Sequence, residues 1–244
     1  MGARDDILGA IRQGLRRGPL PAETRAALAE RIALHRRNLI PARAAALDDA
    51  ARIDLFVAMA EEVQTTVARL ASEAEIPAEV ARYLAAENLP AELVMAPDPA
   101  LDRIPWHERP LLRIRRGRAE PRDAVSLTPC LAAIAETGTL MLVSGEDTPT
   151  TLNFLPDTHI VVLRAGQVVA GYEDAWDLVR ARAGDNTGGD PLGWPRTINL
   201  ITGPSRTGDI EQRIQLGAHG PRRLHVVLVD AAGAPGGDAG GGGR

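Results

Sequence analysis

The chain has 244 residues and a formal net charge of −4, so it can bury a substantial core and has no broad electrostatic attraction for nucleic acid or anionic membranes. Its partners are therefore expected to be small molecules or proteins. All 28 lysine or arginine positions are arginine, which excludes lysine Schiff-base chemistry, and the single cysteine, Cys130, excludes an iron–sulfur cluster ligated by this chain alone.

The first third of the chain is predicted to be helical. Apolar residues recur at helical spacing in residues 3–17, 22–37 and 48–71. Pro- and Gly-containing breaks separate the first two segments from the rest. We expect residues 1–45 to form a helical arm that packs on the core or on a neighbouring subunit.

From residue 91 onward, short apolar strands alternate with short helices. The expected strands are residues 92–96, 111–115, 124–128, 139–143, 159–163, 167–169, 197–202 and 224–230. The expected helices are residues 129–136, 173–182 and 209–217. This alternation predicts an α/β domain over residues 46–230, with a largely parallel sheet that carries helices on both faces. The glycine-rich tail, residues 231–244, is expected to be disordered.

Three loops follow predicted strands, and ligands usually bind at the carboxyl edge of a parallel sheet. In the first loop, Thr128 is expected to cap the helix 129–136, with Gly138 as its left-handed stop. The second loop, residues 144–156, supplies several hydroxyls and the amide of Asn153. The third, around Ser205 and Asp209, is predicted to cradle an anion with the free N–H groups of a helix start. Each loop could equally be a plain connection.

Few side chains suit acid–base or metal chemistry. Glu136 is a candidate acid or base, although a solvated glutamate is an equally good interpretation. His219 is the second candidate, and a loop histidine whose ring bonds nearby backbone is the alternative. Cys130 is expected to be a buried packing residue. The five histidines lack the spacing of a helical metal site, so no metal or other cofactor is expected on this chain.

The arginines at 113, 115, 116 and 118 alternate with apolar residues and are expected to form a solvated strand face, or else to line a cleft for acidic substrates. The acidic N-terminus lacks the features of a signal peptide, and no apolar run approaches the roughly 20 residues of a membrane span. A cytoplasmic location is expected.

Four stretches together resemble the LUD domain of the lactate-utilisation protein C family (LutC, or YkgG-type). They are AAIAETGTLMLVSG (132–145), LNFLPDTHIVVL (152–163), LITGPSRTGDIE (200–211) and LGAHGPRRLHVVLVD (216–230). The resemblance covers residues 91–230. It implies a NagB/RpiA/CoA-transferase-like fold and a three-protein system that oxidises L-lactate to pyruvate, in which cysteine-rich partners carry the iron–sulfur clusters.

The resemblance also implies which positions form the site. The family-like residues are Glu136, Thr137, Gly138, Thr139, Asn153, Pro156, Gly203, Pro204, Ser205, Thr207, Asp209, Glu211, His219, Gly220 and Pro221. The leading interpretation is a cluster-free subunit whose loop from Gly203 to Asp209, with Arg206, binds a small anionic ligand. The alternatives are a stand-alone enzyme, which is CoA-transferase-like with Glu136 as nucleophile or binds phosphosugars or nucleotides, and a regulatory or assembly module.

Overall fold

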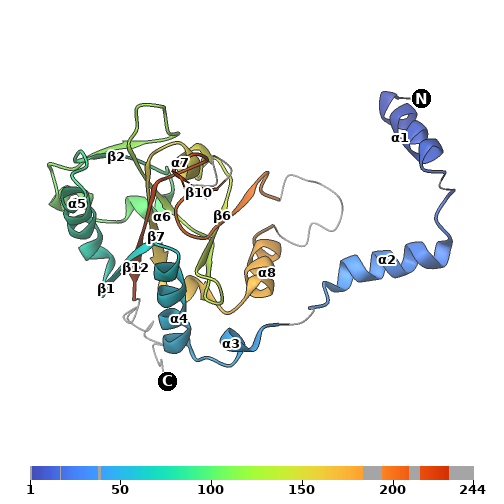
Figure 1. The fold of residues 1–244 in the computed structure, drawn as a ribbon, viewed down its shortest axis with the longest axis horizontal. Helices are drawn as coiled ribbons and strands as arrows, with labels where there is room; N and C mark the ends of the chain where they lie inside the picture. Colours follow the sequence, from blue (N-terminus) through green and yellow to red (C-terminus); the bar gives the residue numbers. More distant parts are fainter. Residues whose placement is uncertain (1, 17, 38–39, 184–193, 209–214, 231–244) are drawn as a thin grey trace, which may run out of the picture. The chain divides into compact units, whose positions relative to one another are not determined.

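The computed structural model describes residues 2–16, 18–37, 40–183, 194–208 and 215–230 (Figure 1). The chain divides into two compact units, Met1–Ile40 and Pro41–Arg244. In the described residues, no helix is both long enough and apolar enough to cross a membrane. The boundaries expected after residues 45 and 230 remain predictions.

The first unit consists of two helices, α1 (Ala3–Gly14) and α2 (Ala22–Leu34), as predicted. Neither helix buries a residue. Ile7, Ile11 and Leu15 recur every four residues along α1 and the turn after it, and all three are exposed. Because residues four apart lie on one helix face, this unit presents an apolar stripe.

The second unit is built around a sheet whose described strands are all parallel, with the order β1-β12-β7-β4-β2-β3. The strands are β1 (Thr66–Leu70), β12 (Arg223–Val229), β7 (Thr158–Arg164), β4 (Val125–Pro129), β2 (Glu92–Met95) and β3 (Arg113–Arg116). Thr158, the first residue of β7, lies opposite the first residues of both β12 and β4. The amino ends of these three strands therefore form one aligned edge.

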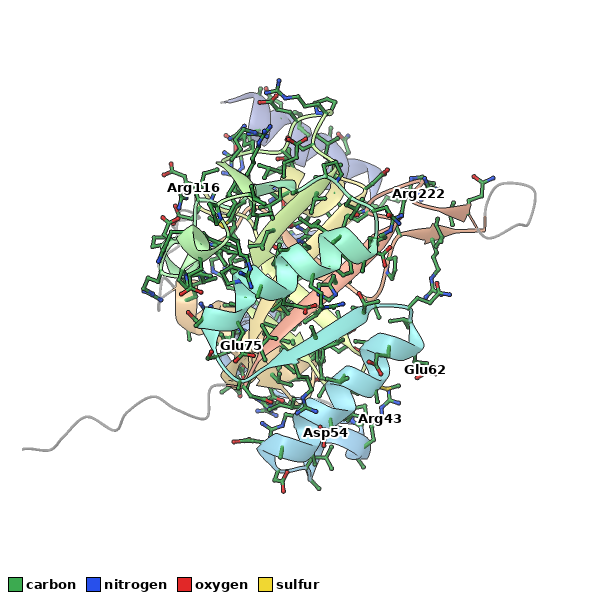
Figure 2. All side chains as sticks on the ribbon, turned by 90° about the vertical axis from the view of Figure 1, so that its left-hand side faces the viewer. Arg43, Asp54, Glu62, Glu75, Arg116 and Arg222 are labelled. Carbon is green, nitrogen blue, oxygen red and sulfur yellow. The ribbon has the colours of Figure 1, made fainter. Side chains whose placement is uncertain are left out.

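Different layers cover the two faces of this parallel sheet. Helix α5 (Ile76–Ala86) packs with side chains such as Ile160 and Val162 on one face. Helix α4 (Asp49–Glu62) and a second sheet pack with the alternate side chains, such as Val161 and Leu163, on the other. Figure 2 shows α4 and α5 with strand β1 between them. The predicted α/β fold, with helices on both faces of a mostly parallel sheet, is confirmed.

The second sheet has the order β8-β5-β6-β9 in the described part of the chain, with β5–β6 and β6–β9 antiparallel. Its strands are β5 (Ala132–Ile134), β6 (Thr139–Val143), β8 (Val168–Val169) and β9 (Ile198–Ile201). Helix α8 (Tyr172–Ala183) packs on its outer face through Ala175 and Val179. A short hairpin follows, β10 (Arg206–Thr207) with β11 (Gln215–Leu216).

Several short helical segments connect these elements. They are α3 (Ala42–Ala45), α6 (Pro99–Asp102), α7 (Thr151–Phe154), η1 (Glu73–Glu75), η2 (Trp106–Glu108) and η3 (Ala165–Gln167). The α7 turn is the one that bears on the site, because it carries Asn153.

Three predicted helices differ from the structure. The helix over 129–136 is wrong: β4 runs through Pro129, and residues 132–134 form β5, buried between two apolar layers. The helix over 48–71 ends at Glu62, and the β-branched Thr66 and Val67 begin strand β1. Of the helix over 209–217, residues 209–214 lie outside the described residues, and Gln215–Leu216 are strand β11.

The turn between β5 and β6 generates a stability prediction. Gly138 has φ +64°, and a Cβ there would lie 2.5 Å from the backbone nitrogen of Ala60 in α4. Gly138→Ala should therefore lower the free energy of unfolding by about 2 kcal/mol or more, measured by urea denaturation. Gly166→Ala is the matched control, because a Cβ at Gly166 meets open space. Equal effects of the two substitutions would contradict the close packing inferred for Gly138.

Candidate functional site

A cavity of about 300 Å³ lies at the aligned amino edge of the parallel sheet. We call it the amino-edge cavity. Its floor includes His159 and Leu224, the second residues of β7 and β12. Its remaining walls come from the turn α7, the end of β9 with the loop that follows, the first residue of β10, and the loop before β12. These residues are Asn153, Phe154, Leu200, Ile201, Thr202, Gly203, Pro204, Ser205, Arg206, His219, Gly220 and Pro221.

Backbone bonds hold the loop after β9 in place. The N–H of Ser205 donates to the carbonyl of Pro221 (2.8 Å), and the N–H of Gly217 donates to the carbonyl of Ser205 (2.9 Å). The N–H of His219 donates to Oγ of Ser205 (3.2 Å). The Ser205 amide is thus occupied, so the predicted cradle of free N–H groups does not form at Ser205.

Arg206 supplies the positive charge of this cavity. Its side chain is exposed, lines the cavity, and makes no hydrogen bond or ion pair with the described residues. No aspartate or glutamate is among the described lining residues. Among the described lining residues, an anion at the mouth of the cavity would therefore meet an available guanidinium and no carboxylate.

His159 is the most unusual side chain of the cavity, and sequence reasoning missed it. It is 0% exposed, and its Nε2 lies 2.8 Å from Oγ1 of Thr128 in β4. Its Nδ1 is buried with no hydrogen-bond partner in the described residues. Burial lowers the pKa of His159 to about 3, so the ring is neutral at physiological pH. The sequence feature that could have pointed to His159 is a histidine near the start of the otherwise apolar segment THIVVL.

Asn153 is the second buried polar side chain. It is 4% exposed, and its side-chain amide makes no hydrogen bond with the described residues. It also lines a second cavity, of about 160 Å³, together with Thr128 and Arg164. Asn153 therefore borders both the amino-edge cavity and a smaller one near the carboxyl ends of β4 and β7.

The ETGT turn lies beside the cavity but does not line it. The hydroxyl oxygens of Thr137 and Thr139 are 2.7 Å apart, and the same distance separates those of Thr139 and Thr202. The hydroxyl of Tyr172, in α8, lies 3.1 Å from that of Thr139. Because Thr202 lines the cavity, this hydroxyl chain connects the turn to it.

Glu136 points elsewhere. Its carboxylate lies near those of Glu173 and Asp174, around Gly171, and its carbonyl accepts a hydrogen bond from Arg43. Within the described residues, no group of three or more histidine, cysteine, aspartate or glutamate side chains could hold a metal ion.

The structure thus brings together only part of the predicted site. Asn153, Gly203, Pro204, Ser205, Arg206 and His219 all line the amino-edge cavity. Glu136, Thr137, Gly138, Thr139 and Thr207 do not line it, and Asp209 lies outside the described residues. The three loops do not leave one carboxyl edge, because β6 and β9 are antiparallel and the loops after them start at opposite ends of the second sheet.

Other predicted side chains are placed as follows. Cys130 is buried as expected, and burial raises the pKa of its thiol to about 12. In strand β3, Arg115 pairs with Asp123 and Arg116 pairs with Asp102. Arg116 is labelled in Figure 2, and Arg222 lies there at the base of the β10–β11 hairpin.

Comparison with known proteins identifies the family. The LUD domain matches residues 53–229, which include both sheets and the whole lining of the cavity. The chain belongs to the LUD domain family. A solved structure of a DUF162 family protein from Deinococcus radiodurans is 28% identical to this LUD protein, with a TM-score of 0.56, and the match covers 75% of this chain and 99% of that one.

Curated relatives carry the name lactate utilization protein C. The Deinococcus radiodurans protein is 37% identical over 168 residues, which are 65% of this LUD chain and 70% of that relative. The Anoxybacillus flavithermus protein is 31% identical over 120 residues (47% and 50%), and the Bacillus subtilis protein is 32% identical over 105 residues (43% and 42%). The matches thus span half or less of the last two relatives.

The buried ring of His159 makes stability depend on pH. The pKa of an unfolded histidine is about 6.5, whereas the folded value is about 3. Protons therefore favour the unfolded chain as the pH falls below 6.5, and this contribution to stability is complete only above that value. Between pH 7 and pH 5, His159 should account for about 2 kcal/mol of lost unfolding free energy.

Urea denaturation at both pH values measures this loss. His159→Gln, which cannot titrate, should show a loss smaller by about that amount. A second buried histidine, His225, stacks on Tyr83 with ring centroids 3.9 Å apart, lies 3.3 Å from Glu79 and has its pKa lowered to about 4, chiefly by burial. In the His159→Gln variant, His225 should still contribute to the loss of unfolding free energy between pH 7 and pH 5. An unchanged loss in His159→Gln would show that His159 is not buried as a neutral ring.

Proposed function

We propose that this protein acts in lactate utilisation, as the cluster-free subunit of an iron–sulfur system that oxidises L-lactate to pyruvate. The observation that carries the proposal is the 168-residue similarity to a protein named lactate utilization protein C. Within the matched LUD domain lies a cavity whose described lining includes buried polar groups and the available cation Arg206. In this proposal the amino-edge cavity binds a small anionic ligand, with Arg206 at its mouth.

The side chains of this chain support this division of labour. The one cysteine is buried, and its raised pKa keeps the thiol protonated. A protonated, buried thiol is neither a cluster ligand nor a redox nucleophile. Electrons from the substrate would therefore pass to clusters on cysteine-rich partner subunits, and this proposal places the assembly in the cytoplasm.

His219 and Glu136 have different places in this proposal. His219 lines the cavity and is the acid or base candidate that could reach a bound ligand. Glu136 does not line it. Its turn is joined to the cavity only through the hydroxyls of Thr137, Thr139 and Thr202, so Glu136 would act on the ligand indirectly.

The first test is genetic. Deleting the gene in its own organism should abolish growth on L-lactate and leave growth on an unrelated carbon source unchanged. The unaltered gene should restore growth, and Arg206→Gln should restore it poorly because the cation is lost. Arg109→Gln is the matched control, since Arg109 is exposed and does not line the cavity. Normal growth of the deletion strain on L-lactate would refute the proposed role.

The second test concerns partners. A tagged full-length chain purified from lactate-grown cells should co-elute with cysteine-rich proteins that contain iron. The apolar stripe of α1 is the candidate contact, so Ile7→Ser with Ile11→Ser should release these proteins, whereas Gln13→Ser, at an exposed position on the opposite face of α1, should not. Iron measured in the eluate distinguishes the outcomes. An iron-free eluate from the unaltered chain would contradict the partner assignment.

A further inference from the structure

Two neighbouring hollows of the second unit share a wall and form one groove. The first hollow measures about 190 Å³ and the second about 660 Å³, and both are lined by Ser144, Trp194 and Pro195. We call them the narrow part and the wide part of the Trp194 groove. The wide part alone falls within the roughly 300–1,000 Å³ of ligand pockets. No described residue that lines the groove also lines the amino-edge cavity, so the groove is a separate candidate site.

Hydrogen bonds hold together the segments that build the wide part. The N–H of Ser144, which follows β6, donates to the carbonyl of Thr197 (2.9 Å), and the N–H of Thr197 donates to Oγ of Ser144 (2.9 Å). The N–H of Ala119, next to Arg118, donates to Oγ1 of Thr151 in α7 (3.1 Å). These segments are therefore ordered before a ligand arrives, which lowers the entropic cost of binding.

Three arginines give the groove a positive charge. Arg118 and Arg196 line the wide part, and Arg182, at the end of α8, lines the narrow part. All three are exposed, and their side chains make no hydrogen bond or ion pair with the described residues. Glu146 is the acidic residue in the described lining. This excess of positive charge favours a ligand with two or more negative charges.

An apolar surface lies beside these cations. The lining of the narrow part includes Leu131, Val143 and Val179, and the ring of Trp194 is 43% exposed. A tryptophan ring that stays accessible in a hollow can stack on a flat ring of a ligand. Because Trp194 also lines the wide part, such a ring would lie next to the arginines. A complementary ligand therefore carries a flat ring at one end and several negative charges at the other.

We propose that the Trp194 groove binds a nucleoside di- or triphosphate. The base stacks on Trp194, and the phosphates lie on Arg118 and Arg196, because a short phosphate chain supplies several negative charges to guanidinium groups. The hydroxyl of Thr150, which lines the wide part and has no hydrogen-bond partner among the described residues, pairs with a phosphate or ribose oxygen. This assignment does not rest on the role in lactate utilisation.

Calorimetric titration of the full-length chain with ATP, adenosine and inorganic triphosphate, in buffer without divalent cations, tests the assignment. Adenosine and inorganic triphosphate each carry one half of the ligand. ATP should bind at least about tenfold more tightly than either, since it occupies both parts of the groove. Trp194→Ala should weaken ATP binding about tenfold and leave inorganic triphosphate unchanged. Arg118→Gln with Arg196→Gln should weaken ATP and inorganic triphosphate by a similar factor.

Two control variants lie outside the groove. Arg109→Gln removes an exposed arginine that lines neither the groove nor the amino-edge cavity. Leu111→Ala removes an apolar side chain that is also exposed and also outside the groove. Both should leave the affinity for ATP unchanged. Circular dichroism of every variant checks that the fold is retained.

Three results would overturn the proposal. The first is that the unaltered chain binds no ATP. The second is that inorganic triphosphate binds as tightly as ATP and Trp194→Ala changes neither, which would show that no base stacks on Trp194. The third is that Arg206→Gln weakens ATP binding as much as the substitution of Arg118 and Arg196 does, which would place the nucleotide in the amino-edge cavity.

Discussion

Two turns of the chain approach the end of helix α4 so closely that neither could carry a side chain there. A Cβ on Gly138 would lie 2.5 Å from the nitrogen of Ala60, and a Cβ on Gly203 would lie 2.5 Å from the carbonyl oxygen of Val63. Both glycines also have positive φ angles, which other residues rarely adopt. Helix α4 thus brings the ETGT turn and the GPS loop together, and the hydroxyls of Thr139 and Thr202 join them.

This close packing explains why the most recognisable motifs do not all line the cavity. In the ETGT turn, the glycine packs against α4 and the two threonines belong to the hydroxyl chain. In the GPS loop, the glycine packs against the end of α4, and the loop also forms a wall of the cavity. A motif can therefore identify a family through packing that positions a site, without each of its residues touching a ligand. Glu136, at the edge of this contact, is the clearest example.

Much of the fold was predictable because the strands are apolar and separated by polar turns. The central strands β7 and β12, helix α8 and the parallel pairing follow directly from that pattern. Residues 129–136 were mispredicted because Thr128 and Pro129 form a good helix start, and tertiary burial between two layers overrode this local preference. The site was predictable only where loops carried it. His159 could not be recognised, since one histidine in an apolar strand has no periodicity that shows its tautomer, its partner or the cavity beside it.

The position of the cavity departs from the usual rule for open α/β sheets, in which ligands bind at the carboxyl ends of the strands. Here β5 and β6 of the second sheet lie between β4 and β7 in the chain, β8 and β9 lie between β7 and β12, and the chain returns from β9 across the amino ends of β7 and β12. At the carboxyl ends, Arg164 pairs with Glu73, and Gln167 bonds the carbonyl of Cys130, so those polar groups already have partners. At the amino ends, Nδ1 of His159 and the side chains of Asn153 and Arg206 make no hydrogen bond with the residues that the structure describes. This difference in hydrogen bonding, rather than the topology of the sheet, is the reason for placing the proposed site of the small anion at the amino edge.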